Sequence, residues 1–256
     1  MSYCYNVGLI LACCAVLAYG VPDKLQPLRT RASSKIVGGT PVASGEFPWH
    51  VSLQDLYDGQ NWTHVCDGSI ISSEFILTDQ ICINNPSIFR IVAGTLNLTI
   101  PGSIHYISEL FADDRTGRHL SLARVSPPFK FGCNTRPVQL PARFAETAAG
   151  SVFTVTAWGS LEQFEPTTTL LKVQSLIIPK DECSILLEGF PDITYFICAI
   201  EFNSELHNMC YLQGYGSPLV HDGELRGVFY IDHCEWPALY TEVSLFRDWI
   251  FRITGV

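Results

Sequence analysis

The feature that most constrains this chain is a series of short β-prone runs, each bounded by turn residues. The sequence carries 19 glycines and 15 prolines, which are spread along it and punctuate these runs. No helical period fills the intervals, so the pattern predicts an all-β barrel or sandwich. The expected strands are residues 50–53, 68–71, 75–77, 89–92, 151–157, 171–178, 196–199, 218–220, 225–230 and 238–243.

The C-terminal segment departs from this pattern. Leu245, Trp249 and Ile253 recur at four-residue spacing, which places them on one face of a helix. Ser244 precedes this face and is a favourable N-cap residue. We therefore expect a short terminal helix that begins at Ser244 and packs on the β-structure.

The N-terminus has the pattern of an export signal. The run from Val7 to Ala18 is apolar but spans only 12 residues, which is short for crossing a bilayer. Small residues at Ala18 and Gly20 predict signal-peptide cleavage after Gly20, and a buried core helix is the alternative interpretation. We expect residues 1–20 to be removed and the product to be secreted, extracellular and without a membrane anchor.

Charge and composition narrow the class of partner. Hydrophobic residues make up 47% of the chain and charged residues 16%, which fits a globular protein and excludes a disordered one. The net charge is −9 and would be near −12 without the basic segment 21–35. Such a chain should not bind nucleic acid through bulk charge. Its histidines show no metal-ligand spacing, so we expect no metal and no cofactor.

Six phrases then occur in a fixed order along the chain. They are IVGG at 36–39, FPWHVSL at 47–53, CDGSIIS at 66–72, ILTDQIC at 76–82, TAWGS at 156–160 and YTEVSLFRDWI at 240–250. In this order they resemble the trypsin-like serine proteases. The resemblance implies two packed six-stranded antiparallel β-barrels with a cleft between them, in a peptidase domain over residues 36–256. It also implies that residues 21–35 form a pro-segment, cleaved between Lys35 and Ile36.

The mechanism of that family needs a hydroxyl nucleophile, an imidazole base and a carboxylate that orients the base. The resemblance places Ile81 at the base position, His119 at the carboxylate position and Tyr215 at the nucleophile position. Isoleucine cannot accept a proton, and a phenol with a pKa of about 10 and no adjacent base is not a practical acyl acceptor. We predict that the chain is not an enzyme and that the Tyr215 side chain fills space in an inactive cleft.

Two positions that support catalysis in the family have also changed. Gly214 stands where an aspartate would pair with the amine freed by activation, and Gln213 stands where a glycine would supply an oxyanion donor. Without that aspartate, inserting the Ile36 amine would bury an unpaired charge at a cost of about 3–5 kcal/mol. We expect cleavage after Lys35 not to trigger the activation change of the family.

The positions of the substrate pocket have diverged in parallel. The resemblance places Asn208 at the pocket base, where an aspartate would select Arg or Lys. Three further residues stand at the pocket wall and one at the position of a pocket glycine; these are Tyr230, Ile231, Asp232 and Ala238. We expect Tyr230 to fill the pocket and block it.

Cysteine usage fits an exported chain. Seven cysteines remain after the signal segment, which implies a few disulfides and one odd thiol. The pairs implied by the resemblance are Cys66–Cys82, Cys183–Cys198 and Cys210–Cys234. Cys133 is left unpaired, either buried and inert or in an intermolecular bridge, and we expect a monomer. Phe153 and His221 stand together at the positions of another pair in the family.

Two sequons predict N-glycosylation of the secreted chain. They are Asn61-Trp62-Thr63 and Asn97-Leu98-Thr99, and both lie in loop-like stretches. Glycans attach to asparagine in exposed segments of this kind. We expect Asn61 and Asn97 to be the modified residues.

These losses favour a catalytically inactive protease homologue that is retained as a secreted binding protein. Among such proteins the chain most resembles the scabies-mite inactivated serine protease paralogues and, behind them, the mite group 3 trypsin-like allergens. That resemblance implies interference with host defence, chiefly through complement components among the host plasma proteins, by surface contacts outside the cleft. One alternative is a non-catalytic cofactor of an active protease cascade, and another is a decoy for protease inhibitors. A third is a diverged endopeptidase that uses His119 and Ser217, with Asp79 as the orienting carboxylate.

Overall fold

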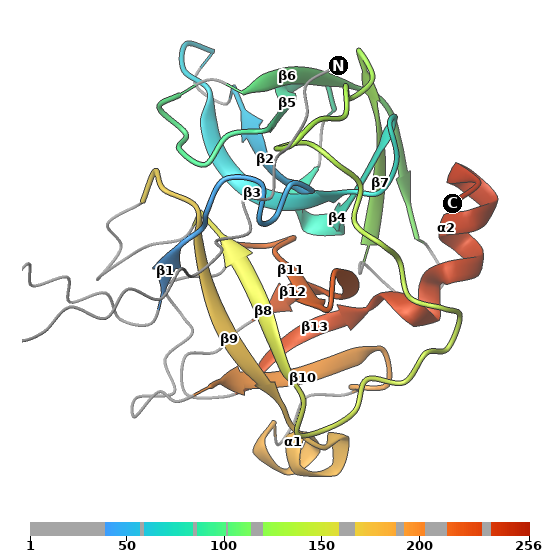
Figure 1. The fold of residues 1–256 in the computed structure, drawn as a ribbon. Helices are drawn as coiled ribbons and strands as arrows, with labels where there is room; N and C mark the ends of the chain where they lie inside the picture. Colours follow the sequence, from blue (N-terminus) through green and yellow to red (C-terminus); the bar gives the residue numbers. More distant parts are fainter. Residues whose placement is uncertain are drawn as a thin grey trace, which may run out of the picture. The chain divides into compact units, whose positions relative to one another are not determined.

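Two β-barrels form the described part of the chain in this computed structural model (Figure 1). The structure describes residues 39–56, 59–83, 86–100, 102–113, 120–158, 167–187, 192–202, 214–231 and 237–256. They belong to one unit over Ile36–Val256. The predicted signal peptide, the pro-segment and the cleavage point between Lys35 and Ile36 lie outside the described residues.

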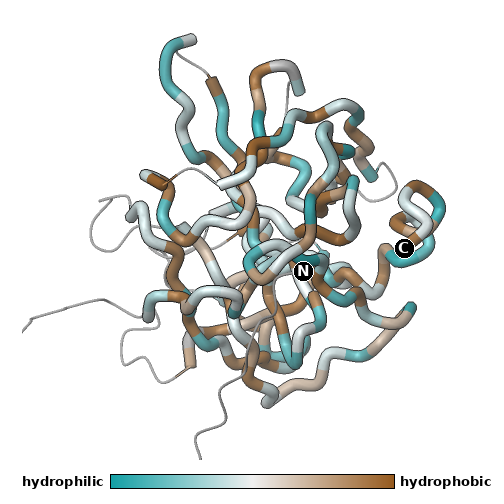
Figure 2. Tube along the Cα trace, turned by 45° about the horizontal axis from the view of Figure 1, so that its top comes forward, coloured by the Kyte–Doolittle hydropathy of each residue, from teal (hydrophilic) through white to brown (hydrophobic). Residues whose placement is uncertain are grey.

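The first barrel is closed by six antiparallel strands in the order β2-β3-β4-β7-β6-β5. They are β2 (His50–Asp55), β3 (Thr63–Ile70), β4 (Phe75–Asp79), β5 (Phe89–Ala93), β6 (Ser103–Ala112) and β7 (Leu120–Ser126). The short 3-10 helices η1 (Gln80–Cys82) and η2 (Pro86–Ile88) lie between β4 and β5. The fully buried Leu53, Ile70 and Ile91 belong to the core of this barrel. Along the trace of the chain, hydrophobic and hydrophilic stretches alternate (Figure 2).

The second barrel is closed in the ring order β8-β9-β10-β13-β12-β11, because β8 pairs with both β9 and β11. Its strands are β8 (Val152–Ala157), β9 (Leu171–Ile177), β10 (Phe196–Glu201), β11 (Pro218–His221), β12 (Glu224–Ile231) and β13 (Ala238–Glu242). The short strand β1 (Thr40–Pro41) adds to β9. The β11–β12 hairpin turns at Asp222 and Gly223, whose φ values of 49° and 78° suit a tight two-residue loop.

A shared apolar cluster holds the barrels and the C-terminal segment together. Phe75 and Leu77 of β4 belong to it, together with Val228 of β12 and Trp249 near the C-terminus. Burial of apolar surface on this scale contributes roughly 1.5–3 kcal/mol for each large side chain. The cluster therefore fixes the end of β4 relative to the second barrel, where the candidate site lies.

The predicted fold class is confirmed: two six-stranded antiparallel barrels and a short C-terminal helix. The elements that were not predicted include β6, β7 and α1, each of which lacks a clear sequence period. In β6 only one residue is buried, whereas β7 is buried along most of its length, so neither strand shows a clean alternation. The helix α1 (Lys180–Leu186) has seven residues, too few for a helical period to stand out.

The C-terminal segment begins with a 3-10 helix, η4 (Val243–Phe246), and continues as the helix α2 (Arg247–Thr254). The predicted cap at Ser244 is wrong, because Ser244 is a buried residue of η4 and α2 starts only after Phe246. The predicted packing face is confirmed: Trp249 is buried, and Leu245 and Ile253 pack partly against the shared apolar cluster. In the described part of the chain, no helix is long and apolar enough to cross a membrane.

Two of the three implied disulfides are present, with Sγ atoms bonded in Cys66–Cys82 and Cys183–Cys198. The third, Cys210–Cys234, lies outside the described residues. Each bond closes a loop of about 15 residues. In a chain-entropy model, a disulfide that closes a loop of that size stabilises the folded state by about 3 kcal/mol.

The prediction for Cys133 is wrong, because this cysteine is disulfide-bonded. The other four described cysteines pair with one another, so its partner lies outside the described residues. Cys133 is exposed in the turn between Gly132 and Thr135, which leaves its sulfur accessible to a cysteine from a distant segment. Family positions alone could not show such a partner.

Phe153 and His221 replace a covalent link with a ring contact. Their ring centroids lie 4.6 Å apart with the planes inclined by 26°. Their strands, β8 and β11, pair directly. The two aromatic residues therefore contact each other at the positions where the resemblance implies a further disulfide.

Candidate functional site

Ile81 and Tyr215 lie at the same end of the contact between the two barrels. Ile81 is in η1, directly after β4, and Tyr215 is in the turn that precedes β11. The amide of Asp67 donates to the carbonyl oxygen of Tyr215 at 2.9 Å. The neighbouring Cys66 is bonded to Cys82, the residue after Ile81. The fold thus brings together two of the three positions assigned to catalysis from the sequence.

Both side chains face solvent. Ile81 is 59% exposed and Tyr215 is 39% exposed, and the nearby Val65 is 37% exposed. The Tyr215 ring lies 6.1 Å from the Phe229 ring. That Tyr215 fills a cleft stays a prediction. The structure therefore exposes an aliphatic and an aromatic side chain at the positions that the resemblance assigns to the base and the nucleophile.

A buried polar network lies next to this surface. Asp67 of β3 is its centre and is fully buried. Its Oδ1 lies 2.9 Å from Nε2 of His50, and its Oδ2 accepts a hydrogen bond of 2.7 Å from the hydroxyl of Ser217. Nδ1 of His50 lies 2.8 Å from Oγ1 of Thr156. The network therefore links β2 and β3 of the first barrel to β8 and the start of β11 in the second.

Two glycines let the second barrel approach Asp67 closely. A Cβ added to Gly214 would lie 2.8 Å from Oδ2 of Asp67. A Cβ added to Gly216 would lie 2.1 Å from the Asp67 carbonyl oxygen and 2.3 Å from Oγ1 of Thr78. Gly214 is the position at which the resemblance calls for an aspartate. Asp67 thus places a carboxylate in the space that a side chain at residue 214 would enter.

The network holds Asp67 in its charged form. Burial raises the pKa of this carboxyl, but the contacts with His50, His64 and Ser217 outweigh burial and hold the pKa below its usual range. Burial lowers the pKa of His64, although Asp67 opposes this effect. The His64 ring lies between Oγ of Ser52 at 2.8 Å and Oδ1 of Asp67 at 3.7 Å. Because ionised Asp67 can only accept, Nε2 of His50 carries the hydrogen that the pair shares.

Thr156, His50 and Asp67 follow the order hydroxyl, imidazole and carboxylate, which is the order of a hydrolase relay. Their exposed fractions are 1%, 3% and 0%. A substrate cannot reach a hydroxyl that is covered in this way. The arrangement therefore joins strands of the two barrels through buried hydrogen bonds.

Asp79 is a second buried carboxyl, and it has fewer hydrogen-bond partners than Asp67. Its Oδ1 accepts a hydrogen bond of 2.8 Å from the Ile81 amide, and its Oδ2 has no hydrogen-bond partner among the described residues. Burial raises the pKa of Asp79 to about 8, against the lowering effect of that hydrogen bond. The geometry does not favour Ser217 as a nucleophile served by Asp79, because Ser217 is fully buried and donates to Asp67.

The Trypsin family model matches residues 36–250, which include both barrels and the first half of α2. The chain belongs to the trypsin family. Trypsin-1 of Astacus astacus is 30% identical over 84% of this chain and 98% of that trypsin. Trypsin iota of Drosophila melanogaster is 27% identical over 86% of this chain and 89% of its own length.

Solved structures with the trypsin fold are similar over the same region. Human heparin binding protein matches with a TM-score of 0.73 and 24% identity, covering 86% of this chain and 97% of that protein. The scabies mite inactivated protease paralogue S-I1 matches with a TM-score of 0.73 and 23% identity, covering 85% of this chain and 99% of that protein. At these identities the likeness shows the trypsin fold alone.

The structure describes three of the positions assigned to the trypsin pocket. Tyr230 and Ile231 are half-buried in the apolar cluster around the Cys183–Cys198 disulfide, and the Tyr230 ring lies 4.9 Å from the Phe196 ring. Ala238 is buried at the start of β13. Blockage of the pocket by Tyr230 stays a prediction, since the other pocket positions, Asn208 and Asp232, lie outside the described residues. His119 and Gln213, assigned to the catalytic carboxylate and the oxyanion donor, lie outside them as well.

The two sequons differ in their surroundings. Asn61 is exposed before β3. Asn97 is half-buried, and its Oδ1 accepts hydrogen bonds from the Thr99 amide at 2.9 Å and from the Thr99 hydroxyl at 2.8 Å. The second sequon is therefore folded into a local turn. Glycosylation of both residues stays a prediction.

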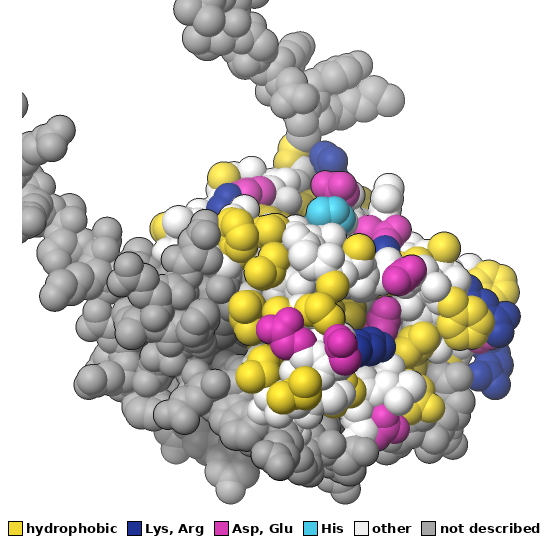
Figure 3. All heavy atoms as spheres, turned by 90° about the horizontal axis from the view of Figure 1, so that it is seen from below, with side chains coloured by type: hydrophobic (Ala, Val, Ile, Leu, Met, Phe, Trp, Pro, Cys, Tyr) yellow, Lys and Arg dark blue, Asp and Glu magenta, His cyan; other side chains and the backbone are white. Residues whose placement is uncertain are grey.

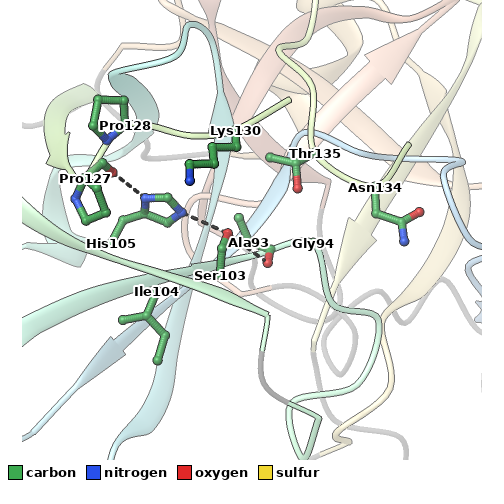
Figure 4. A pocket seen from close by; sticks show the side chains of 10 residues that line it. All are labelled: Ala93, Gly94, Ser103, Ile104, His105, Pro127, Pro128, Lys130, Asn134 and Thr135. Atoms are coloured by element: carbon green, nitrogen blue, oxygen red, sulfur yellow. Dashed lines mark hydrogen bonds between the residues drawn. The ribbon is translucent and has the colours of Figure 1, made fainter. Parts of the chain in front are cut away.

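A pocket of about 380 Å³ lies on the first barrel, between the ends of β5 and β6 and the segment after β7 (Figure 4). His105 lies within it, and its ring nitrogens are 2.5 Å from the Pro127 carbonyl oxygen and 2.9 Å from the Ser103 hydroxyl. Both nitrogens are therefore occupied by the fold itself. The lining includes neither Ile81 nor Tyr215, so the pocket is separate from those two positions.

Proposed function

We propose that this chain is a secreted pseudoprotease of the trypsin family that binds other proteins and does not cleave them. The observation that carries the proposal is the pair Ile81 and Tyr215. At two positions where catalysis would need a base and a nucleophile, the chain has exposed apolar side chains. The hydroxyl, imidazole and carboxylate that do lie in line are sealed inside the contact between the barrels.

Known proteins with this fold support a role in binding. One structural neighbour is named as an inactivated protease paralogue of the scabies mite, and another is named as a heparin binding protein. Heparin itself is a poor partner for a chain with a net charge of −9. We propose host plasma proteins, chiefly complement components, as the partners, bound through surface residues outside the degenerate site.

A fluorophosphonate probe, which labels activated serines, should not label the secreted protein. Ser217 is buried and donates to Asp67, and Tyr215 has Ile81 in place of a base. The variant Tyr215→Ser should also stay unlabelled, because a new serine there still lacks its base. An active trypsin under the same conditions is the positive control. Labelling of the wild type at a comparable level would contradict the proposal.

Binding can be tested by immobilising the secreted protein and passing mammalian plasma over it. An active trypsin blocked with the fluorophosphonate serves as the control, because it has the same fold and no free nucleophile. We expect this chain to retain a plasma protein that the blocked trypsin does not retain. Equal retention on both surfaces would contradict the binding function.

Cleavage after Lys35 should leave the melting temperature unchanged within about 2 °C. In the family the freed amine pairs with an aspartate at the position of Gly214. The carboxylate nearest to this position belongs to Asp67, which His50 and Ser217 already engage. Calorimetry of the uncut and the cut protein would measure the effect. A rise of many degrees on cleavage would show that the amine has found a partner after all.

A further inference from the structure

Phe144 has a strained backbone and an exposed side chain. Its φ is 56°, in the left-handed region that bulky residues rarely adopt. It is the third residue of a turn in which the Ala145 amide donates to the Ala142 carbonyl at 3.1 Å, a position that favours glycine. Phe144 is also 62% exposed. Burial of the ring does not offset the strain, which indicates a role outside the stability of the fold.

Arg143 holds this ring in place. Its guanidinium carbon lies 4.7 Å from the centroid of the Phe144 ring, and its Nη2 bonds to Oδ2 of Asp248 at 2.8 Å. The Phe144 amide donates to the carbonyl oxygen of Ser244 at 3.2 Å. The turn is therefore tied to η4 and α2, and the ring is oriented before any partner arrives. An oriented aromatic ring beside an arginine is typical of the residues that dominate binding energies at interfaces.

The helix α2 carries a second exposed ring beside this tie. Phe251 is 62% exposed and follows Asp248 by three residues, so the two side chains are neighbours on the helix surface. Trp249 and Ile250 provide the buried face of α2, so Phe251 is not needed for its packing. Figure 3 shows hydrophobic and basic side chains gathered at the right-hand edge, the side on which α2 lies in Figure 1.

The same region is basic in an acidic chain. Arg247 and Arg252 of α2 add to Arg143, whereas the whole chain has a net charge of −9. Asp248 is already paired with Arg143. Arg252 is exposed and has no ion-pair or hydrogen-bond partner among the described residues. The terminal surface, as we call Arg143, Phe144, Arg247, Phe251 and Arg252, therefore combines two apolar rings with positive charge.

We propose that the terminal surface is where this chain binds its protein partner, and that the partner presents an apolar recess rimmed by acidic residues. The two rings enter the recess, and Arg252, which has no ion-pair or hydrogen-bond partner among the described residues, meets the acidic rim. The inference rests on the proposed function and deepens it, because it assigns the contact to residues distinct from Ile81 and Tyr215. A partner with a basic surface, which the overall charge would favour, does not fit this region.

Two substitutions test the rings in the plasma-retention experiment described above. Phe144→Gly and Phe251→Ala should each lower the amount of the retained plasma protein at least about tenfold, as expected for a central contact residue. Phe144→Gly should also raise the melting temperature, because glycine adopts a positive φ without strain. Arg252→Glu should lower retention, and Arg252→Lys should largely preserve it.

Matched controls lie on other parts of the second barrel. Asp222→Gly relaxes a left-handed residue of the same kind, with a φ of 49°, in the β11–β12 turn. Ile185→Ala removes a side chain that is 78% exposed from α1. Both variants should retain the plasma protein as the wild type does.

The outcomes separate this inference from the proposed function. Undiminished retention by Phe144→Gly and Phe251→Ala would overturn the terminal surface as the contact while leaving the binding function intact. No retention by the wild type would overturn both. A lower melting temperature of Phe144→Gly would overturn the inference, because the ring would then serve the fold. Binding to vesicles of phosphatidylserine and phosphatidylcholine that Phe144→Gly abolishes would assign the surface to lipid and overturn the protein partner.

Discussion

Replacing Asp79 with alanine should stabilise the protein by about 2–4 kcal/mol at pH 8 and destabilise it by about 1 kcal/mol at pH 4. Burial raises the pKa of this carboxyl to about 8, from an ordinary value of 3.8. Between these two values the folded protein holds a proton that the unfolded chain has released. Stability therefore falls as the pH rises through this range. Alanine removes the carboxyl and, with it, the loss of stability.

The expected size follows from opposing effects. A tenfold change in the acid constant corresponds to about 1.4 kcal/mol, so the raised pKa sets a ceiling of about 5 kcal/mol at pH 8. Alanine also removes the hydrogen bond from the Ile81 amide, which contributes about 1 kcal/mol. The cavity left by the smaller alanine side chain lowers the stability by a further fraction of a kcal/mol. Alanine is also the residue that the resemblance calls for at this position.

Urea unfolding of the disulfide-intact protein at pH 4, 6 and 8 would measure this effect. Asp79→Asn is the matched control, because asparagine keeps an acceptor for the Ile81 amide but cannot ionise. It should lose the same pH dependence with a smaller gain, since its amide hydrogens lack partners. Equal gains at pH 4 and pH 8 would contradict the raised pKa. A confirmed result would also show that Asp79 is protonated near neutral pH and cannot orient a catalytic base.

The overall fold could be predicted from the sequence because ordered motifs carry it. The runs beginning at His50, Phe75 and Leu171 are strands where expected. The pairing of Phe153 with His221 could also be predicted, because both cysteines of a family disulfide are missing together. The wrong prediction was the N-cap of the terminal helix. Ser244 is buried in η4, so α2 starts later, and the capping propensity of serine does not indicate this burial.

The site could be predicted only in part, because its contacts are distant in sequence. Asp67 lies within a motif of the family. A single aspartate in a strand forms no repeating pattern that would mark it as the centre of a buried network. Its side chain meets His50, 17 residues away, and Ser217, 150 residues away. The strain at Phe144 was equally hidden, since a phenylalanine at a turn position that favours glycine gives no signal of the conformation it adopts.

Moving the buried carboxylate from residue 67 to residue 214 should test the network that joins the barrels. Asp67→Ala should destabilise the protein by about 3–5 kcal/mol, because His50 and Ser217 lose a charged partner in a buried site. Gly214→Asp alone should also destabilise it. The new Cβ would lie 2.8 Å from Oδ2 of Asp67 and would bring a second carboxylate beside the first.

The double variant Asp67→Ala, Gly214→Asp should be more stable than the sum of the single effects by at least about 2 kcal/mol. Removal of the Asp67 side chain clears the space toward which a Cβ at residue 214 points. The relocated carboxylate can then approach His50 and Ser217 from the second barrel. Urea unfolding of the four proteins gives this coupling energy directly. Additive effects would show that the two positions do not share one space.

The dependence on pH separates a charged anchor from simple packing at Asp67. Burial raises the pKa of Asp67, but the contacts with His50, His64 and Ser217 hold it below the ordinary value of 3.8. The stability contributed by Asp67 is therefore present above that value and is lost as the pH falls through the folded-state pKa. The gap in stability between the wild type and Asp67→Ala should thus narrow on acidification. A gap that stays constant with pH would mean that Asp67 acts by its shape, and a neutral side chain would then hold the barrels equally well.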